Sequence, residues 1–296
     1  PCYNEEKNLR SGALEKVADY LEKQKYTWEV IVVDDGSKDK SVEFINKFSL
    51  KNIMELNDDL SEFYGILLGD GCISKYKNDG RIRYAIRIDG NSMTDYYYYK
   101  HLQSLIKNIL DKEVKIKYRN YGNNMFITFL HKEFAVFLHD KFGFPYGKKK
   151  NLVIPKEIIN NKKFLNNFLK GFFDTDGCIY FTKNNSPIRN YPIIEISTHD
   201  SCLLKQFKEI LENMGFNIKI SHFKDSVKIH GKKGVTKWMN EIGSNNIDKY
   251  SKFLFWKEFG FCYNIKELPL NQRLEKLKEM GPMRFELTTS GLLKPY

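Results

Sequence analysis

The sequence predicts a mixed α+β fold in which two tandem αββαββα modules, related by a pseudo-twofold axis and forming a β-saddle, follow a partial α/β segment. Residues 169–177 repeat residues 63–71, 106 positions apart, and both copies are apolar segments that end in Asp-Gly followed by Cys-Ile. A shorter repeat has an offset of 100 residues: Phe142-Gly143 precedes Lys149, and Ile242-Gly243 precedes Lys249. Repeats of this length are modules rather than solenoid units. We expect the α/β segment at 1–57, modules at 58–155 and 156–262, and a C-terminal extension at 263–296 with a disordered end.

Composition indicates a protein with a real core and a basic surface. The 296 residues are 42% hydrophobic, and the formal net charge is +11. Residues 1–57 hold 9 Lys and Arg against 11 Asp and Glu, so the remainder carries +13. Such a positive charge favours a polyanionic partner such as nucleic acid. No run of 18 uncharged apolar residues predicts a membrane span, and five cysteines without metal-type spacing predict reduced thiols in a cytoplasmic protein.

The first segment has the element order of an α/β sheet. A helical apolar pattern runs over residues 14–24, and a buried strand is expected at 28–33. That strand ends in Asp34-Asp35-Gly36-Ser37, and a short helix is expected at 41–48. An acidic turn at the carboxyl end of a strand is where such sheets bind ligands.

Each module is predicted to repeat the same seven elements. After the first motif we expect strands at 72–76 and 81–89, a helix at 94–110, strands at 114–121 and 125–130, and a helix at 132–142. After the second motif we expect strands at 178–182 and 193–198, a helix at 202–214, strands at 217–222 and 227–230, and a helix at 235–242. Asp200 or Ser201 is a suitable N-cap for the 202–214 helix, and Gly215 a suitable stop. Beyond the modules, an amphipathic stretch is expected at 273–280, and 281–296 has no periodicity.

The two motifs predict a close helix pair with two acids at its end. Small residues one helical turn apart allow two helix backbones to approach closely, and each motif carries such a pair. These residues are Gly65 and Gly69 in the first motif and Gly171 and Thr175 in the second. If the helices pack in parallel, Asp70 and Asp176 lie side by side at negative helix C-termini and require a cation. Mg²⁺, with Mn²⁺ as a substitute, suits two carboxylates, and such metal sites hydrolyse phosphodiesters in nucleases.

The strands predict a basic surface for DNA. In residues 81–89 the basic residues Arg81, Arg83 and Arg87 alternate with the apolar residues Ile82, Tyr84, Ile86 and Ile88. Because alternate side chains of a strand point to opposite faces, one face of the sheet becomes basic and can enter a DNA groove. The expected DNA-binding residues are Arg81, Arg83, Arg87, Lys115, Lys117 and Arg119, with Lys219 and Lys228 in the second module.

Residues 58 to about 280 resemble a single-chain LAGLIDADG, or dodecapeptide-type, homing endonuclease. The resemblance is carried by residues 64–71 and by the closer match at 169–177; the first copy departs at the sixth position, where Leu68 replaces Asp. It implies that Asp70 and Asp176 are the metal-binding catalytic aspartates. It also implies basic active-site residues, for which Lys149 and Lys249 are the candidates and Lys148 is the near rival. Members of this family cut double-stranded DNA at long asymmetric sites, and a single-chain member is expected to be a monomer.

Residues 1–57 resemble the start of a family 2 glycosyltransferase. The match rests on Pro1-Cys2-Tyr3-Asn4-Glu5-Glu6 and on residues 32–39 around Asp34-Asp35-Gly36-Ser37. In that family these elements contact the nucleotide of a sugar donor. Only about 55 residues match, so we do not expect sugar transfer.

The leading hypothesis is therefore a homing-type DNA endonuclease whose frame is inserted into, and fused with, a glycosyltransferase gene. Its expected location is the cytoplasm of a prokaryote, in association with the nucleoid. The alternative is an RNA maturase or a non-cleaving nucleic-acid-binding protein on the same fold, and glycosyltransferase activity is a remote third. Association with an intron or intein is typical of the family, but no His-Asn pair occurs, so protein splicing is not expected.

Overall fold

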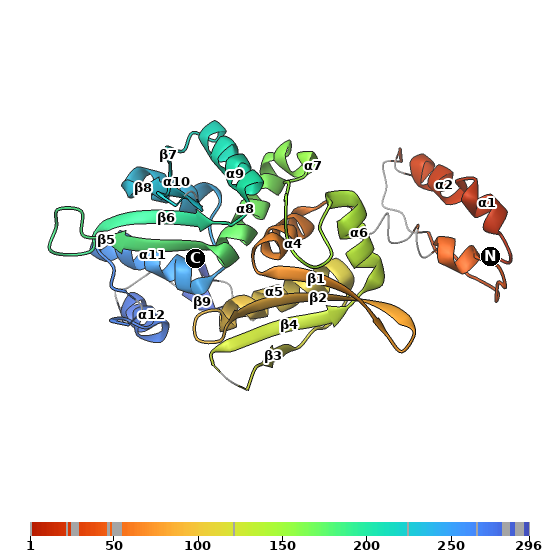
Figure 1. Cartoon of the computed structure of the whole chain (residues 1–296), viewed down its shortest axis with the longest axis horizontal. Helices are drawn as coiled ribbons and strands as arrows, with labels where there is room; N and C mark the ends of the chain where they lie inside the picture. Colours follow the sequence, from red (N-terminus) through yellow and green to blue (C-terminus); the bar gives the residue numbers. More distant parts are fainter. Residues whose placement is uncertain are drawn as a thin grey trace. The chain divides into compact units, whose positions relative to one another are not determined.

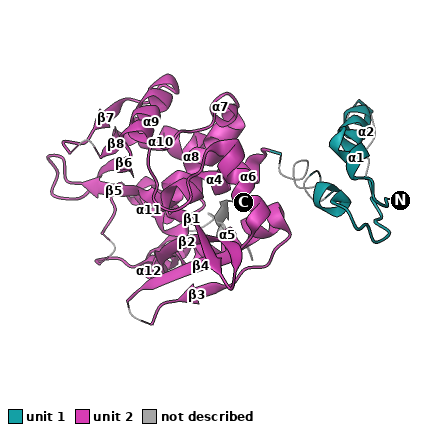
Figure 2. Cartoon of the chain, turned by 45° about the vertical axis from the view of Figure 1, so that its right-hand side comes forward, with its two compact units in different colours: residues 1–55 teal, residues 56–296 magenta. Residues whose placement is uncertain are grey.

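The computed structural model describes residues 2–21, 23–24, 30–45, 48, 55–120, 122–223, 225–264, 266–279, 285–287 and 293–295. The chain divides into two compact units, residues 1–55 and 56–296 (Figure 2). The expected repeat lies wholly within the second unit.

The first unit is mainly helical in its described part. It contains α1 (Glu6–Arg10), α2 (Ala13–Leu21) and a helical stretch at residues 41–45. The buried strand predicted at 28–33 is wrong for its described residues: Ile31 is 75% exposed, and the only strand-like pairing described is one parallel bridge from Cys2 to Asp34. Residues 28 and 29 lie outside the described residues. Apolar β-branched residues suggested burial, but the described chain around them offers no neighbouring sheet to cover them.

The first module has the predicted element order. It runs α4 (Asp58–Gly69), β1 (Gly71–Asn78), β2 (Arg81–Asn91), α5 (Tyr96–Leu110), β3 (Ile116–Tyr118), β4 (Asn124–Leu130) and α6 (Lys132–Phe142) (Figure 1). Its four strands form an antiparallel sheet in the order β1-β2-β4-β3. Strand β3 is shorter than the predicted 114–121, so Lys115 lies just before it.

The second module repeats this order after a short extra helix, α7 (Lys156–Ile159). Its elements are α8 (Lys162–Asp176), β5 (Gly177–Thr182), β6 (Tyr191–Ser197), α9 (Ser201–Asn213), β7 (Ile218–Ile220), β8 (Ser226–His230) and α10 (Gly231–Glu241). The sheet order β5-β6-β8-β7 matches that of the first module strand for strand. The mixed α+β fold with two tandem modules is therefore confirmed.

The structure contains a helix that the sequence patterns did not indicate, α11 (Ile247–Phe259), which follows α10. The predicted stretch at 273–280 forms α12 (Leu270–Glu279), which begins three residues earlier than predicted. A short antiparallel pair, β9 (Phe285–Leu287) and β10 (Leu293–Pro295), lies in the aperiodic end. Helix α11 was missed because it is buried on several sides, so it has no single apolar stripe.

Side-chain caps fix where the central helices begin. Asn57 accepts the Leu60 N–H before α4, and Asn161 accepts those of Lys163 and Phe164 before α8. Asp200 caps α9 as predicted, and Gly215 follows the helix in the left-handed conformation at φ +78°. These caps fix the first residue of each of the two motif helices.

Both sheets have one face buried against helices. In the first sheet Ile73, Ile86 and Ile127 are fully buried, and in the second Ile194 and Ile229 are at most 1% exposed. The opposite faces carry the polar side chains. The alternation predicted for residues 81–89 holds except at Ile82, which is 58% exposed near the β1–β2 turn.

Candidate active site

The two motif helices, α4 and α8, pack against each other at their small residues (Figure 1). A Cβ placed on Gly65 would lie 2.9 Å from the Phe172 nitrogen and would overlap the Phe168 carbonyl. At Gly69 it would lie 2.8 Å from the Thr175 Cβ, which shows how closely the two chains approach. A Cβ on Gly171 would likewise overlap the Glu62 carbonyl. All four residues named from the sequence lie at this contact, which we call the seam.

The seam brings the two motif acids into one electrostatic environment. Asp70 follows the last residue of α4, and Asp176 is the last residue of α8. Both residues are exposed to solvent. Desolvation by the neighbouring protein atoms, and next the charge of Asp176, raise the pKa of Asp70 to about 7. Desolvation also raises the pKa of Asp176, against the opposing charges of two lysines. Each carboxylate is therefore harder to ionise than an isolated aspartate.

Lys149 and Lys249 both bind carbonyl oxygens at the C-terminal end of their own motif helix. The Lys149 amine donates to the carbonyl oxygens of Leu68, at 2.8 Å, and of Gly69. The Lys249 amine donates to those of Phe173 and Thr175, at 2.6 and 3.2 Å. Each lysine thus neutralises the negative C-terminus of its own motif helix. Lys148, the near rival, is exposed.

The electrostatic influence of each lysine also crosses the seam. Lys249 lowers the pKa of Asp70 more than Lys149 does, whereas Lys149 has the larger effect on Asp176. Burial lowers the pKa of both amines, and the neighbouring carboxylates partly offset this effect. Two acids and two bases from the two modules therefore form one cluster.

The chemistry of this cluster fits a hard divalent cation. Among the described residues no group of three or more His, Cys, Asp or Glu side chains converges as a ready-made metal site. Asp70 and Asp176 instead offer two carboxylates. Desolvation and, second, the charge of Asp176 raise the pKa of Asp70, and a bound cation would favour its ionised form. Mg²⁺ needs only one or two protein carboxylates when phosphate and water complete its shell.

The polar face of the first sheet carries the predicted arginines and lysines. Arg81, Lys117 and Arg119 are exposed, as is Lys115 beside β3. The Arg87 guanidinium is bound by Asp89, at 2.7 Å, and lies 3.9 Å from the centre of the Phe126 ring. Arg119 shares Asp89 at 3.2 Å, while the buried Arg83 Nε has no hydrogen-bond partner among the described residues. The residues gather on one face, but Asp89 restrains two of them.

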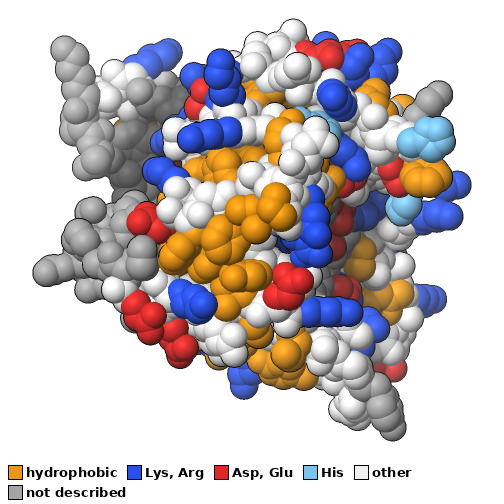
Figure 3. Space-filling model, turned by 90° about the vertical axis from the view of Figure 1, so that its left-hand side faces the viewer, with side chains coloured by type: hydrophobic (Ala, Val, Ile, Leu, Met, Phe, Trp, Pro, Cys, Tyr) orange, Lys and Arg blue, Asp and Glu red, His pale blue; other side chains and the backbone are white. Residues whose placement is uncertain are grey.

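The corresponding face of the second sheet is less basic. Lys219 and Lys228 are opposite each other on β7 and β8. Lys228 pairs with Glu195 at 3.1 Å, so its charge is largely compensated, while Lys219 is exposed. Figure 3 shows one side of the molecule, on which Lys and Arg side chains are mixed with hydrophobic and acidic ones.

A buried polar cluster near the seam was not predicted from the sequence. Glu62 on α4 is 4% exposed and contacts His101 at 2.6 Å and Lys170 at 3.0 Å. Asp174 on α8 is 3% exposed; burial raises its pKa to about 6 against the hydrogen bonds from Ser244 and Asn245. Both acids interrupt apolar helical runs in the sequence, and that interruption was the available signal.

The acidic turn of the first unit is closed on itself. Asp34 accepts hydrogen bonds from the backbone of Gly36 and Ser37, at 3.2 and 3.1 Å, and from the Ser37 hydroxyl. Asn4 accepts from the Lys38 N–H at 2.8 Å, which joins the first residues of the chain to this turn. The two predicted motif pieces of residues 1–57 therefore meet.

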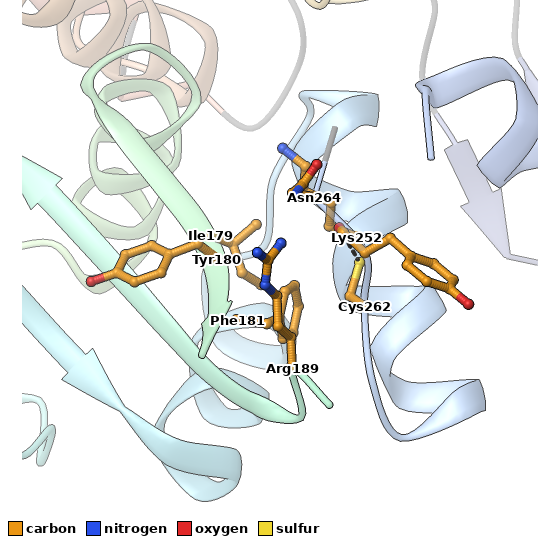
Figure 4. A pocket seen from close by; sticks show the side chains of 8 residues that line it. Ile179, Tyr180, Phe181, Arg189, Lys252, Cys262 and Asn264 are labelled. Atoms are coloured by element: carbon orange, nitrogen blue, oxygen red, sulfur yellow. Dashed lines mark hydrogen bonds between the residues drawn. The ribbon is translucent and has the colours of Figure 1, made fainter. Parts of the chain in front are cut away.

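One further cavity, of about 250 Å³, lies between the β5–β6 hairpin and the chain that follows α11 (Figure 4). Its basic lining residues are paired: Lys252 with Asp248 at 2.6 Å and Arg189 with Glu267 at 3.5 Å. The cavity is lined by Ile179, Tyr180, Phe181, Arg189, Lys252, Cys262, Tyr263 and Asn264, none of which is a predicted site residue.

Three family models match the chain. The model of the LAGLIDADG DNA endonuclease family matches residues 60–168, and that of the LAGLIDADG-like domain matches residues 163–252. The model of Glycosyl transferase family 2 matches residues 1–57.

Curated relatives fall into two groups. A dolichyl-phosphate beta-glucosyltransferase of Trichomonas vaginalis is 31% identical over 117 residues, covering 37% of this chain and 34% of its own length. The chain thus spans about a third of the length of the first curated relatives it matches. A probable translation initiation factor IF-2 of Methanocaldococcus jannaschii is 26% identical, covering 73% of this chain and 16% of its own. The tRNA-splicing ligase RtcB of Pyrococcus furiosus is 30% identical, and the match covers 64% of this chain and 20% of the ligase.

Similar solved structures include homing endonucleases. Variants of I-DmoI align at a TM-score of 0.46 and 16% identity, covering 64% of this chain and 92% of theirs. I-LtrWI bound to target DNA aligns at a TM-score of 0.46 and 15% identity, covering 75% of this chain and 97% of its own length. A mutant of I-SmaMI aligns at a TM-score of 0.47 and 12% identity, covering 76% of this chain and 97% of its own length.

In the part of the chain that the structure describes, no helix is long and apolar enough to cross a membrane.

Proposed function

Because the chain joins two LAGLIDADG modules to a glycosyltransferase family 2 segment, we propose that it is a homing-type DNA endonuclease. It cuts both strands of a long asymmetric site in double-stranded DNA and depends on a divalent cation. The observation that supports this proposal is the seam, where small residues let α4 and α8 approach closely and the charge of Asp176 reaches Asp70 and adds to the rise of its pKa. Non-identical modules predict a non-palindromic target.

Asp70 and Asp176 are proposed to hold the cation, with Mg²⁺ as the natural ion and Mn²⁺ as a substitute. When bound, the ion supplies Lewis-acid stabilisation of the charge that develops on a scissile phosphodiester. The lysines add fixed positive charge at the same place. Because Lys149 and Lys249 are held by helix carbonyls, their amines are oriented before any substrate arrives.

The sheets are proposed to supply the DNA surface. Exposed Arg81, Lys117 and Lys219 stand on the polar faces and can contact phosphates without breaking an internal ion pair. Arg87 is different, because Asp89 and Phe126 fix its guanidinium in one plane. A fixed guanidinium suits the bidentate reading of a base edge.

The test is cleavage of a family 2 glycosyltransferase gene that lacks the insertion. We expect the full chain with Mg²⁺ to cut that DNA at one place and to leave an allele that contains the insertion uncut. Asp70→Asn and Asp176→Asn should each lower the rate by about a thousandfold or more while DNA binding persists. Asp140→Asn, on the exposed side of α6, is the matched control.

Two outcomes would contradict the proposal. If no insertion-free allele is cut under any divalent metal, the endonuclease function is wrong. If the chain instead binds structured RNA tightly, and both Asp variants bind it equally well, the RNA maturase is the better reading. Binding of a sugar nucleotide that Asp34→Ala abolishes would support the glycosyltransferase alternative.

A further inference from the structure

The segment that precedes Lys249 is fastened to both modules at once. The Asn245 side chain donates to Glu62 Oε1 on α4 at 2.7 Å, and its backbone N–H donates to Asp174 Oδ2 on α8 at 2.7 Å. The Ser244 hydroxyl donates to the other oxygen of Asp174. Glu62 and Asp174 are almost fully buried, so these hydrogen bonds are shielded from water.

Asn246 connects Lys249 itself to the first module. Its Oδ1 accepts the backbone N–H groups of Asp248 and Lys249, at 3.0 and 3.4 Å, and so begins α11. Its Nδ2 donates to Asp95 Oδ1 at 3.1 Å and to the Asp174 carbonyl at 3.4 Å. The residue is 1% exposed. One buried amide thus links the backbone of the second-module lysine to an acid of the first module.

The segment before Lys149 is held differently. The Gly147 N–H donates to the Ile73 carbonyl at 2.7 Å, and His139 contacts the Phe144 carbonyl at 2.8 Å, all within the first module. A contact with the second module comes three residues after the lysine, where the Leu152 N–H donates to Asp200 at 3.0 Å. In that contact the donor is a backbone N–H, whereas the cross-module donors before Lys249 are the side-chain amides of Asn245 and Asn246.

We propose that Asn245 and Asn246 are positioning residues that set the Lys249 amine from across the seam. The inference rests on the proposed endonuclease function. Asn246 acts through the start of α11, and Asn245 acts through the buried Glu62–His101 pair. The Lys249 half of the site therefore depends on the first module for its geometry, and the Lys149 half depends on its own sheet. Loss of either amide should impair the cutting of one DNA strand selectively.

The cleavage test measures the two strands separately on a duplex labelled at each 5′ end. Lys249→Met identifies the strand that this lysine serves. We expect Asn245→Ala and Asn246→Ser each to slow the cleavage of that strand by about tenfold or more, since a small displacement of a catalytic group lowers the rate by this much. Serine is chosen at position 246 because it retains a helix N-cap. The other strand should change by less than about twofold. The ratio of the two rates is insensitive to the fraction of folded protein, and Asn213→Ala on the exposed end of α9 is the control.

Trace acetylation of lysines, read by mass spectrometry, tests the same inference without cleavage. Labelling of Lys249 should rise in both variants while that of Lys149 stays within about twofold, because only the segment that carries Lys249 loses a link to the first module. Equal slowing of both strands, or an unchanged ratio of Lys249 to Lys149 labelling, would show the inference to be wrong. If the wild-type chain cuts nothing but Lys249 labelling still rises selectively, the positioning inference stands and the proposed function fails.

Discussion

Lys170 and Tyr64 occupy the same position in the two motif helices, 106 residues apart, yet they give the seam two different flanks. Lys170 pairs with Glu62 across the seam at 3.0 Å. Tyr64 lies instead against the ring of Phe168, with centroids 6.0 Å apart. Phe168 is itself the counterpart of Glu62 in the repeat. One flank of the pseudo-twofold axis is therefore ionic and the other aromatic.

This difference makes the two modules non-interchangeable. A first module paired with a copy of itself would place Glu62 against Tyr64, so Glu62 would keep His101 but lose its amine partner. Removal of one partner from a buried carboxylate is destabilising. The unequal flanks thus favour pairing of the two different modules within one chain.

The ionic flank predicts an acid-dependent stability. Burial alone would raise the pKa of Glu62, but the hydrogen bond and charge of His101 and the charge of Lys170 outweigh it and lower the pKa to about 2. A carboxylate whose pKa is lower in the folded state stabilises the fold at pH values above the pKa that it has in the unfolded state. Glu62 therefore contributes about 3 kcal/mol above pH ~4.5, and this is lost as the pH falls toward ~2.

Urea unfolding between about pH 3 and pH 7 measures this contribution. Glu62→Gln should be less stable at neutral pH and should lose less stability on acidification than the wild-type chain. Glu113→Gln, at a side chain 84% exposed, should leave the profile unchanged. Identical acid slopes for the wild-type and Glu62→Gln chains would refute this role.

Gly171→Ala should destabilise the chain although alanine is normally the better helix residue. The added Cβ would overlap the Glu62 carbonyl and force the helices apart, at a cost of about 1–3 kcal/mol against a propensity gain of about 1 kcal/mol. Gly234→Ala on α10 is the matched change, because its Cβ would meet only the Ile229 Cγ2 methyl, at 2.6 Å. Thermal unfolding of both variants makes the comparison, and equal melting temperatures would contradict a tight seam.

The raised pKa of Asp70 predicts how cleavage depends on pH. Since the carboxylate must be ionised to bind a cation, the rate should rise with pH through about 7 at low Mg²⁺. Protons and metal compete for the same oxygens, so more Mg²⁺ should move the midpoint to lower pH. Cleavage rates on a grid of pH and Mg²⁺ concentrations measure this shift, and a midpoint that ignores the metal would argue against Asp70 as a ligand.

Lys117→Ala should weaken DNA binding through phosphate contact rather than sequence reading. Lys117 is exposed on the polar face of β3, so its loss should weaken specific and non-specific DNA alike and reduce the salt slope of log K by about 1. Lys205→Ala, on α9 with a side chain 78% exposed, is the control of equal charge. Fluorescence anisotropy over a series of salt concentrations gives both slopes; a loss confined to one DNA sequence would contradict the phosphate role.

Much of the fold was visible in the sequence because the two copies of the motif fix the period of everything between them. The spacing of Gly65 and Gly69, repeated by Gly171 and Thr175, is enough on its own to indicate a close helix contact. Alternation along residues 81–89 indicated which face of β2 would be buried. Helix α11 was not predicted, because a regular spacing of apolar residues indicates only a helix with one buried side, and α11 is buried on several sides.

The predicted strand at 28–33 failed for the opposite reason. Valine and isoleucine indicate burial only where another element exists to cover them, and the described part of residues 1–55 provides a single bridge at Asp34. Composition cannot report that missing neighbour.

The sequence by itself determined the modules, their order, the two acids and the two lysines, because each of these is a local pattern that recurs at a fixed offset. Only the tertiary structure decided how the two halves differ. The Glu62–Lys170 pair, the aromatic flank at Tyr64 and the amide links from Asn245 and Asn246 join residues far apart in the chain. Such contacts depend on how the two helices pack, and no single segment contains the information that specifies them.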